Sequence, residues 1–310
     1  MEFGAHLPLM DFGGHPYTLE HLLGYARTAE RLGFNTLCAN DHLVYDVPWL
    51  DGPTALASVM GVSGNMTLAT TVALAVVRGP IPVAKMIGAI DRLSGGRGLV
   101  VVGPGSSPAD YAAVSVSFEE RWARLDEVVA VLRVLWGRDP GPFVGRFYST
   151  EGINLAPRPV QAGGPPIWIG SWGSPAGLRR VARLADGWLA SAYNTTPELF
   201  TEALEQLSVH LIEEGKKPEL FPNGLATMWF YITENRSEAD DILRHRVVPA
   251  IHRSEEVLRE RLPIGSASAF VEKLAAFAES GVQRVMVWPV ADDERQLELF
   301  WNQVALAVRS

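Results

Sequence analysis

Short apolar runs rich in β-branched residues alternate with longer amphipathic segments along most of the chain, and this alternation limits the possible folds most strongly. The segments at 19–32 and 118–136 carry apolar residues at helical spacing. The strand candidates are the runs at 3–9, 36–39, 67–74, 98–102, 166–169, 187–190, 226–233 and 284–288. Strands that alternate with helices build a parallel sheet, and eight of them suit a closed (β/α)8 TIM barrel. We therefore expect an α/β barrel and a single domain over residues 1–310.

One segment breaks this rhythm. Residues 139–164 contain Pro140, Pro142, Pro157, Pro159 and paired glycines, which indicate irregular structure or a small hairpin. We expect this segment to be an insertion near the barrel mouth.

Charge and composition exclude several classes of protein. The formal net charge is -8 and no lysine or arginine cluster occurs, which argues against a nucleic-acid partner. The longest apolar runs, such as 72–77, are far shorter than the roughly 20 residues of a membrane span, so we expect no membrane partner. A single cysteine, Cys38, and a first segment without a basic region before an apolar core favour a cytoplasmic protein. Inside a strand, Cys38 is expected to be a small buried apolar residue.

Polar residues that follow barrel strands are the first candidates for chemistry, because barrel active sites lie at the carboxyl ends of the strands. Asp41 and His42 follow the second strand and place a carboxylate beside an imidazole, the side chain best suited to proton exchange near neutral pH. A loop cap would explain the same pair. Thr71 lies within the third strand, where threonine is also a common strand former.

Two glycine-rich turns complete the candidate site. Gly103, Gly105 and Ser106 follow the fourth strand, where glycine allows a close approach between backbone and ligand, although a tight turn explains them nearly as well. The loop of Gly170, Ser171, Trp172 and Gly173 joins the fifth strand to a helix, whose N-terminal N–H groups attract anions. We interpret this loop as a candidate phosphate site.

Other ligand motifs are absent from the sequence. The seven histidines form neither a His-x-His nor a His-x-x-x-His pair, so we expect no metal site. Neither a P-loop motif nor an opening Gly-x-Gly-x-x-Gly occurs, which argues against P-loop and Rossmann proteins.

Taken together, the segments resemble the luciferase-like monooxygenase family, and above all its branch that uses the deazaflavin coenzyme F420. The most specific stretch runs over 84–105, from Ala84 and Lys85 through IDRLSGGR at 90–97 to GLVVVGPG at 98–105. Supporting matches follow in order along the chain: Asp41-His42-Leu43, FEER at 118–121, Leu125-Asp126-Glu127, 166–170, ADGW at 185–188 and Ile264-Gly265-Ser266. The similarity spans nearly the whole chain.

The resemblance implies positions for the cofactor and its contacts. In the deazaflavin branch a bulge in the third strand carries a non-proline cis peptide behind the ring, and Thr71 and Val72 are the matching residues. His42 and its neighbour Asp41 match the cofactor-contacting end of strand two. The remaining expected contacts are Gly103, Gly105 and Ser106 for the ribityl chain and Gly170, Ser171, Trp172 and Gly173 for the phosphate.

We expect an F420-dependent oxidoreductase that transfers a hydride between the deazaflavin and a small organic substrate, with His42 as the catalytic proton donor or acceptor. One alternative is a luciferase-like monooxygenase that uses reduced FMN and O2. Another is a barrel that binds a flavin or deazaflavin without catalysis.

The substrate has no recognisable code in the sequence. The loops expected to line its pocket, 11–18, 45–51 and 139–164, match no ligand motif. The family's sugar-phosphate dehydrogenase has an acidic residue at the position of Ser106, which argues against glucose 6-phosphate. The resemblance also suggests a homodimer.

Overall fold

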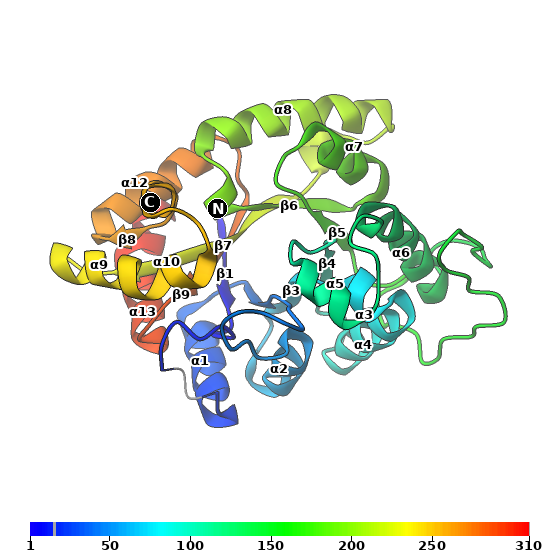
Figure 1. Ribbon diagram of the computed structural model, residues 1–310, viewed down its shortest axis with the longest axis horizontal. Helices are drawn as coiled ribbons and strands as arrows, with labels where there is room; N and C mark the ends of the chain where they lie inside the picture. The colour runs from blue at the N-terminus through cyan, green and yellow to red at the C-terminus, as the bar shows by residue number, and fades with distance from the viewer. Residues whose placement is uncertain (15–16, 310) are drawn as a thin grey trace.

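The structure is a computed structural model that describes residues 1–14 and 17–309; residues 15 and 16, in the first expected pocket loop, lie outside the described residues. Eight parallel strands close into a barrel surrounded by helices (Figure 1). Consecutive strands pair from β1 through β7, and β9 pairs with both β7 and β1. The barrel strands are β1 Glu2–His6, β2 Thr36–Ala39, β3 Thr67–Ala73, β4 Gly98–Val102, β5 Ile167–Gly170, β6 Gly187–Ser191, β7 Asn223–Ile232 and β9 Arg284–Pro289. The predicted (β/α)8 barrel is confirmed.

Both faces of the strands are buried, which explains their continuous apolar runs. In β4, Leu99 and Val101 belong to a small cluster inside the barrel, whereas Val100 and Val102 pack in the larger cluster that includes the helices. Cys38 is fully buried in the inner cluster, as expected, and burial raises the pKa of its thiol to about 12.

The helices begin and end at the residues that cap them. Thr18 caps α1 Leu19–Leu32, and Gly33, in the left-handed region at φ 92°, ends it. The other α-helices are α2 Gly52–Ser58, α3 Ala75–Arg78, α4 Pro80–Leu93, α5 Pro108–Ala113, α6 Arg121–Trp136, α7 Pro175–Leu184, α8 Pro197–Glu213, α9 Arg236–Ile242, α10 Val248–Ile251, α11 Glu255–Arg261, α12 Ala267–Glu279, α13 Asp293–Leu299 and α14 Leu306–Arg309. Short helices such as α3, α5 and α11 were not predicted, because one or two turns leave no measurable periodicity.

Residues 139–164 lie against the outer side of α6. None of them lines the cavity described below. Their backbone N–H groups at Arg146, Phe147 and Tyr148 donate to Glu127 of α6, and Gln161 donates to the carbonyl of Gly98, the first residue of β4. Figure 1 shows the segment looping outward beyond α6. It joins the end of a helix to the start of a strand, so both of its ends lie away from the barrel mouth. Its middle reaches the N-terminal end of α6, where Nη2 of Arg146 donates to Glu120 over 2.7 Å, one residue before Arg121.

A different segment contacts the loops of the barrel mouth. The helices α9 to α11 follow β7, and the Tyr45 hydroxyl donates to the carbonyl of Ala250 over 3.1 Å. His252 pairs with Asp46 at 2.9 Å in the same loop after β2. A short strand, β8 Ile264–Gly265, then pairs with the end of β7. Among the described helices, none has the length and apolar character needed to cross a bilayer.

Candidate functional site

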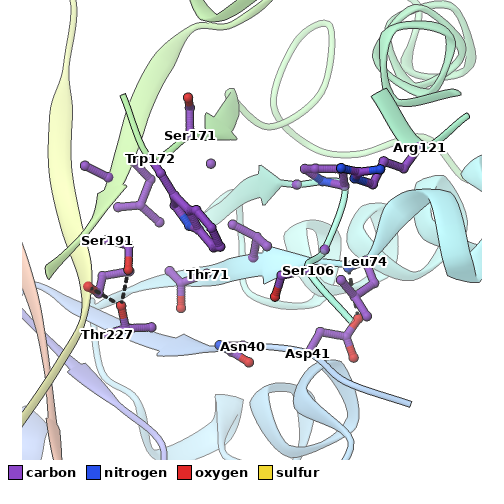
Figure 2. A pocket seen from close by; sticks show the side chains of 18 of the residues that line it. Asn40, Asp41, Thr71, Leu74, Ser106, Arg121, Ser171, Trp172, Ser191 and Thr227 are labelled. Carbon is purple, nitrogen blue, oxygen red and sulfur yellow. Dashed lines mark hydrogen bonds between the residues drawn. The ribbon is translucent and has the colours of Figure 1, made fainter. Parts of the chain in front are cut away.

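A cavity of about 650 Å³ opens at the carboxyl ends of strands β2 to β7. Figure 2 shows Thr71, Ser106, Arg121 and Trp172 arranged around this space. Every residue predicted for the site lines it: Asp41, His42, Thr71, Val72, Gly103, Gly105, Ser106, Gly170, Ser171, Trp172 and Gly173. The expected convergence of the turns after strands two to five is therefore present in the structure.

Val72 enters the cavity at an irregularity in β3. The pairing of β3 with β4 shifts between Thr71 and Ala73, and the Thr71–Val72 peptide is cis, as the resemblance implies. A Cβ atom at Gly103 would lie 2.8 Å from one Val72 methyl group, and a Cβ at Gly170 would lie 2.7 Å from the other. These two glycines therefore make room for Val72, a reason for glycine that differs from the predicted approach of backbone to ligand.

His42 is held by a carboxylate that the sequence analysis missed. Its Nδ1 lies 2.7 Å from Oδ2 of Asp110, and the other oxygen of Asp110 accepts the backbone N–H groups of Leu43 and Val44 at 2.8 Å. Burial alone would raise the pKa of Asp110, but the hydrogen bonds from His42, Val44 and Leu43 hold it below the usual value. An ionised carboxylate only accepts, so Nδ1 of His42 carries a proton and Nε2 is left for exchange.

Asp41 lines the cavity, but its carboxylate is committed to other groups. It receives two hydrogen bonds of 2.7 Å from the guanidinium of Arg78 and one of 3.1 Å from the backbone N–H of Leu74. Arg78 also pairs with Asp51, the N-cap of α2. Asp41 thus fixes the backbone that follows Val72 rather than presenting a free carboxylate to a ligand.

Two buried polar atoms on the cavity wall have no hydrogen-bond partner. They are Oγ1 of Thr71 and Oδ1 of Asn40. Buried polar atoms are usually paired, and an unpaired one costs about 1–3 kcal/mol. Beside them, Ser191 and Thr227 share a hydrogen bond of 2.9 Å, and Thr227 has a φ of 55° at a register shift of β7 (Figure 2). This wall suits the polar edge of a heteroaromatic ring.

The other end of the cavity offers groups for an anion. Ser174 caps the N-terminus of α7 by accepting the N–H of Gly177, and the loop before it carries Trp172, which is 53% exposed. Arg121, the first residue of α6, lines the same cavity with its guanidinium 3.9 Å from the centre of the Phe118 ring. A helix N-terminus together with an arginine suits a phosphate.

Three of these features could not be recognised as site residues from the sequence: Asp110, Arg121 and the Ser191–Thr227 pair. Asn40 directly precedes Asp41 and His42 and belongs to the same candidate place after the second strand. Arg121 stood within the motif at 118–121, but nothing there indicated that it reaches the barrel mouth. In the described part of the chain, no group of three or more His, Cys, Asp or Glu side chains could hold a metal ion.

A closed parallel barrel with a ligand-sized cavity at its carboxyl mouth defines the (β/α)8-barrel class of proteins. The family described as luciferase-like monooxygenase matches residues 1–254, and the chain belongs to this family.

Curated relatives are 27% and 28% identical to the chain over the residues that align. It is 27% identical to the F420-dependent glucose-6-phosphate dehydrogenase of Nakamurella multipartita, over 100% of this chain and 97% of that one. It is 28% identical to the F420-dependent hydroxymycolic acid dehydrogenase of Mycobacterium tuberculosis, over 57% of this chain. That match spans only 50% of the length of the mycobacterial relative.

A solved structure confirms the fold. An F420-dependent secondary alcohol dehydrogenase, in complex with an F420–acetone adduct, superposes with a TM-score of 0.87 at 18% identity. The superposition covers 100% of this chain and 99% of the other.

Proposed function

We propose that the chain is an F420-dependent oxidoreductase that moves a hydride between the deazaflavin and a small organic substrate. The observation that carries this proposal is a cavity with an unpaired polar wall at one end and, at the other, a loop before a helix N-terminus together with Arg121. A cavity of about 650 Å³ is large enough for a tricyclic ring with a phosphorylated tail.

Each part of the cavity has a task in this proposal. Val72 would support one face of the ring, and the unpaired atoms of Asn40 and Thr71 would meet its polar edge. Gly103, Gly105 and Ser106 would follow the ribityl chain. The phosphate would lie between the loop of Gly170, Ser171, Trp172 and Gly173 and the guanidinium of Arg121.

Bound F420 supplies a carbon that gives or receives a hydride, and the residues around it supply placement and a proton. Asp110 holds the Nδ1–H of His42, so Nε2 is the atom that gives a proton to the substrate or takes one from it. Asp41 acts indirectly, because it fixes Leu74 and thereby the end of β3.

The curated relatives favour F420 over FMN. The dehydrogenases of Nakamurella multipartita and Mycobacterium tuberculosis are both named as F420-dependent. A monooxygenase that uses FMN would need the same ribityl and phosphate contacts, so the cavity alone does not separate the two cofactors.

A titration of the purified protein with F420 and with FMN, followed by ligand fluorescence, tests the proposal. We expect saturable binding of F420 at micromolar concentration or below and much weaker binding of FMN. Tight binding of FMN with no binding of F420 would instead support the monooxygenase.

We also propose that residues 1–310 form one domain, since β1 and β9 pair within the same barrel. A cytoplasmic homodimer is proposed from the family resemblance, and sedimentation velocity of the full chain tests the dimer.

A further inference from the structure

A packed cluster of aromatic side chains, called the aromatic compartment below, adjoins the cavity above the ends of β1 and β9; of its members, Tyr193 lines the cavity. Its members are Phe12, Trp49, Tyr193, Trp229 and Trp288. The ring centres of Trp288 lie 5.7 Å from those of both Trp49 and Trp229, and Phe12 packs edge-on to Trp229 at 6.2 Å. These rings come from loops after β1, β2 and β6 and from β7 and β9, so the chain assembles them only on folding.

Three indole N–H groups in this compartment are buried and have no hydrogen-bond partner: those of Trp49, Trp229 and Trp288. Two buried tryptophans elsewhere in the chain have partners. The indole N–H of Trp136 donates to the carbonyl of Ala84 at 3.1 Å, and that of Trp188 donates to the carbonyl of Ser171 at 3.0 Å. Three unpaired donors in one group of contacting rings indicate a place for an acceptor that the protein itself does not supply.

His6 adds one unpaired acceptor. Its ring stacks on Trp288 with centres 3.6 Å apart, and its Nδ1 lies 2.7 Å from the carbonyl of Leu7. Nδ1 therefore donates, and the buried Nε2 has a free lone pair. Burial lowers the pKa of His6 to about 3, so the ring is neutral at physiological pH. The lining of the compartment is consequently uncharged.

Two aromatic residues contact both the compartment and the cavity wall. Tyr193 lines the cavity, and its ring lies 5.1 Å from Trp229. Trp49 lies 4.7 Å from the ring of His42 and 5.7 Å from Trp288. Both Tyr193 and Trp49 are partly exposed, whereas Trp229 and Trp288 are buried. Rotation of either partly exposed ring would extend the cavity, beside His42, toward the unpaired indole donors.

We propose that the aromatic compartment is the substrate site, and that it selects an uncharged ring-bearing molecule whose carbonyl or hydroxyl oxygen accepts hydrogen bonds from the indole N–H groups of Trp229 and Trp288. This inference rests on the proposed function, in which the deazaflavin exchanges a hydride with the substrate. The deazaflavin would lie on the other side of His42. The side chains of the compartment themselves include no cation, and the guanidinium of Arg253 lies 5.8 Å from the centre of the Tyr193 ring. We therefore expect a neutral molecule to bind here better than a sugar phosphate, the substrate class in the name of the Nakamurella multipartita relative.

The first test measures binding of acetophenone, a neutral aromatic ketone labelled with 13C at the carbonyl, to the protein loaded with oxidised F420 and to the protein alone. We expect Trp229→Phe and Trp288→Phe each to weaken binding about 5- to 15-fold, because each removes one donor. The carbonyl resonance of the bound ketone should also move toward its value in apolar solvent. Trp136→Phe, whose indole N–H is already paired, is the matched control and should change neither quantity.

A second measurement uses the unchanged protein and so does not depend on the folding of variants. In a 1H–15N spectrum, acetophenone should shift the indole resonances of Trp229 and Trp288 downfield and leave those of Trp136 and Trp188 in place. Unchanged indole resonances at saturating ketone, or displacement of the ketone by glucose 6-phosphate, would overturn the proposal.

The two proposals fail separately. Absence of F420 binding, with the ketone still shifting the indole resonances of Trp229 and Trp288, would contradict the proposed function and leave the aromatic compartment standing. Tight F420 binding without any response of these indoles to the ketone would contradict the substrate inference alone.

Discussion

Nδ1 of His42 lies 2.7 Å from Oδ2 of Asp110, and this contact orients the one titratable side chain of the cavity wall that can exchange a proton near neutral pH. Asp110 is buried and also accepts two backbone N–H groups from the loop after β2. The carboxylate therefore fixes the histidine ring and its loop together, and the pair acts as a unit.

Removing either member of this pair should lower turnover by different amounts. We expect His42→Ala to reduce kcat about 10²- to 10⁴-fold, which is the usual contribution of a positioned proton donor or acceptor. Asp110→Asn should reduce kcat less, about 10- to 100-fold, with KM unchanged and with an altered pH profile, because Asp110 acts through His42. Asp46→Asn, at an exposed carboxylate, is the control. Steady-state kinetics with F420 measure kcat and KM of the three variants. A wild-type kcat in His42→Ala would remove that residue from the mechanism.

His6 should make the free energy of unfolding depend on pH. Burial lowers its pKa from 6.5 to about 3, so the unfolded chain binds more protons than the folded chain between these values. The contribution of neutral His6 to the free energy of unfolding is complete above pH 6.5. It is lost as the pH falls toward 3, at up to about 1.4 kcal/mol per pH unit. In urea unfolding, the free energy of unfolding should decrease less between pH 7 and pH 5 for His6→Phe than for the wild type. His245→Gln, at an exposed histidine, should keep the wild-type decrease. Equal decreases in all three proteins would contradict this explanation.

The glycines beside Val72 should tolerate no added methyl group. We expect Gly103→Ala and Gly170→Ala each to destabilise the fold by about 1–3 kcal/mol, because the new Cβ would lie within 2.8 Å of a Val72 methyl group. Cofactor affinity should fall as well, since Val72 would shift within the cavity. Gly61→Ala adds a methyl group where no atom lies within 4 Å, and it is the control. Thermal unfolding and F420 titration of the three variants give the melting temperature and the F420 affinity of each. If both quantities were those of the wild type in Gly170→Ala, Val72 would be free to move.

Arg121 should contribute to affinity through the phosphate of the cofactor. We expect Arg121→Ala to weaken F420 binding about 10-fold at low salt and less at high salt, where the charge interaction is screened. Binding of the deazaflavin derivative that lacks the phosphate should not change. Arg27→Ala, at an exposed arginine of α1, is the control. If the phosphate-free derivative lost affinity to the same extent, Arg121 would have to act on the ring or the cavity shape instead.

The sequence predicted most of the barrel, because strands buried on both faces and long amphipathic helices have clear periodic patterns. All of the candidate residues line the cavity, since they lie in the last residues of barrel strands or directly after them. Residues 139–164 are irregular with one small antiparallel bridge, as their prolines and glycines indicated. Their contact with the N-terminal end of α6, through Arg146 and Glu120, has no signal in the sequence.

The partners of the site residues could not be predicted for a different reason. Asp110 lies in α5, a helix of six residues whose sequence has no recognisable period, and it reaches His42 across 68 positions of the chain. The pairing of Asp41 with Arg78 depends in the same way on α3, which has only four residues. The aromatic compartment joins residues from 12 to 288, and no local pattern encodes such contacts.

A crystal structure of the protein with bound F420 tests the central claim most directly. The account predicts the deazaflavin ring against Val72, with its polar edge within hydrogen-bond distance of Asn40 or Thr71 and its phosphate at the loop of Gly170 to Ser174 near Arg121. A ring bound outside this cavity, or a phosphate with no contact to that loop, would contradict it.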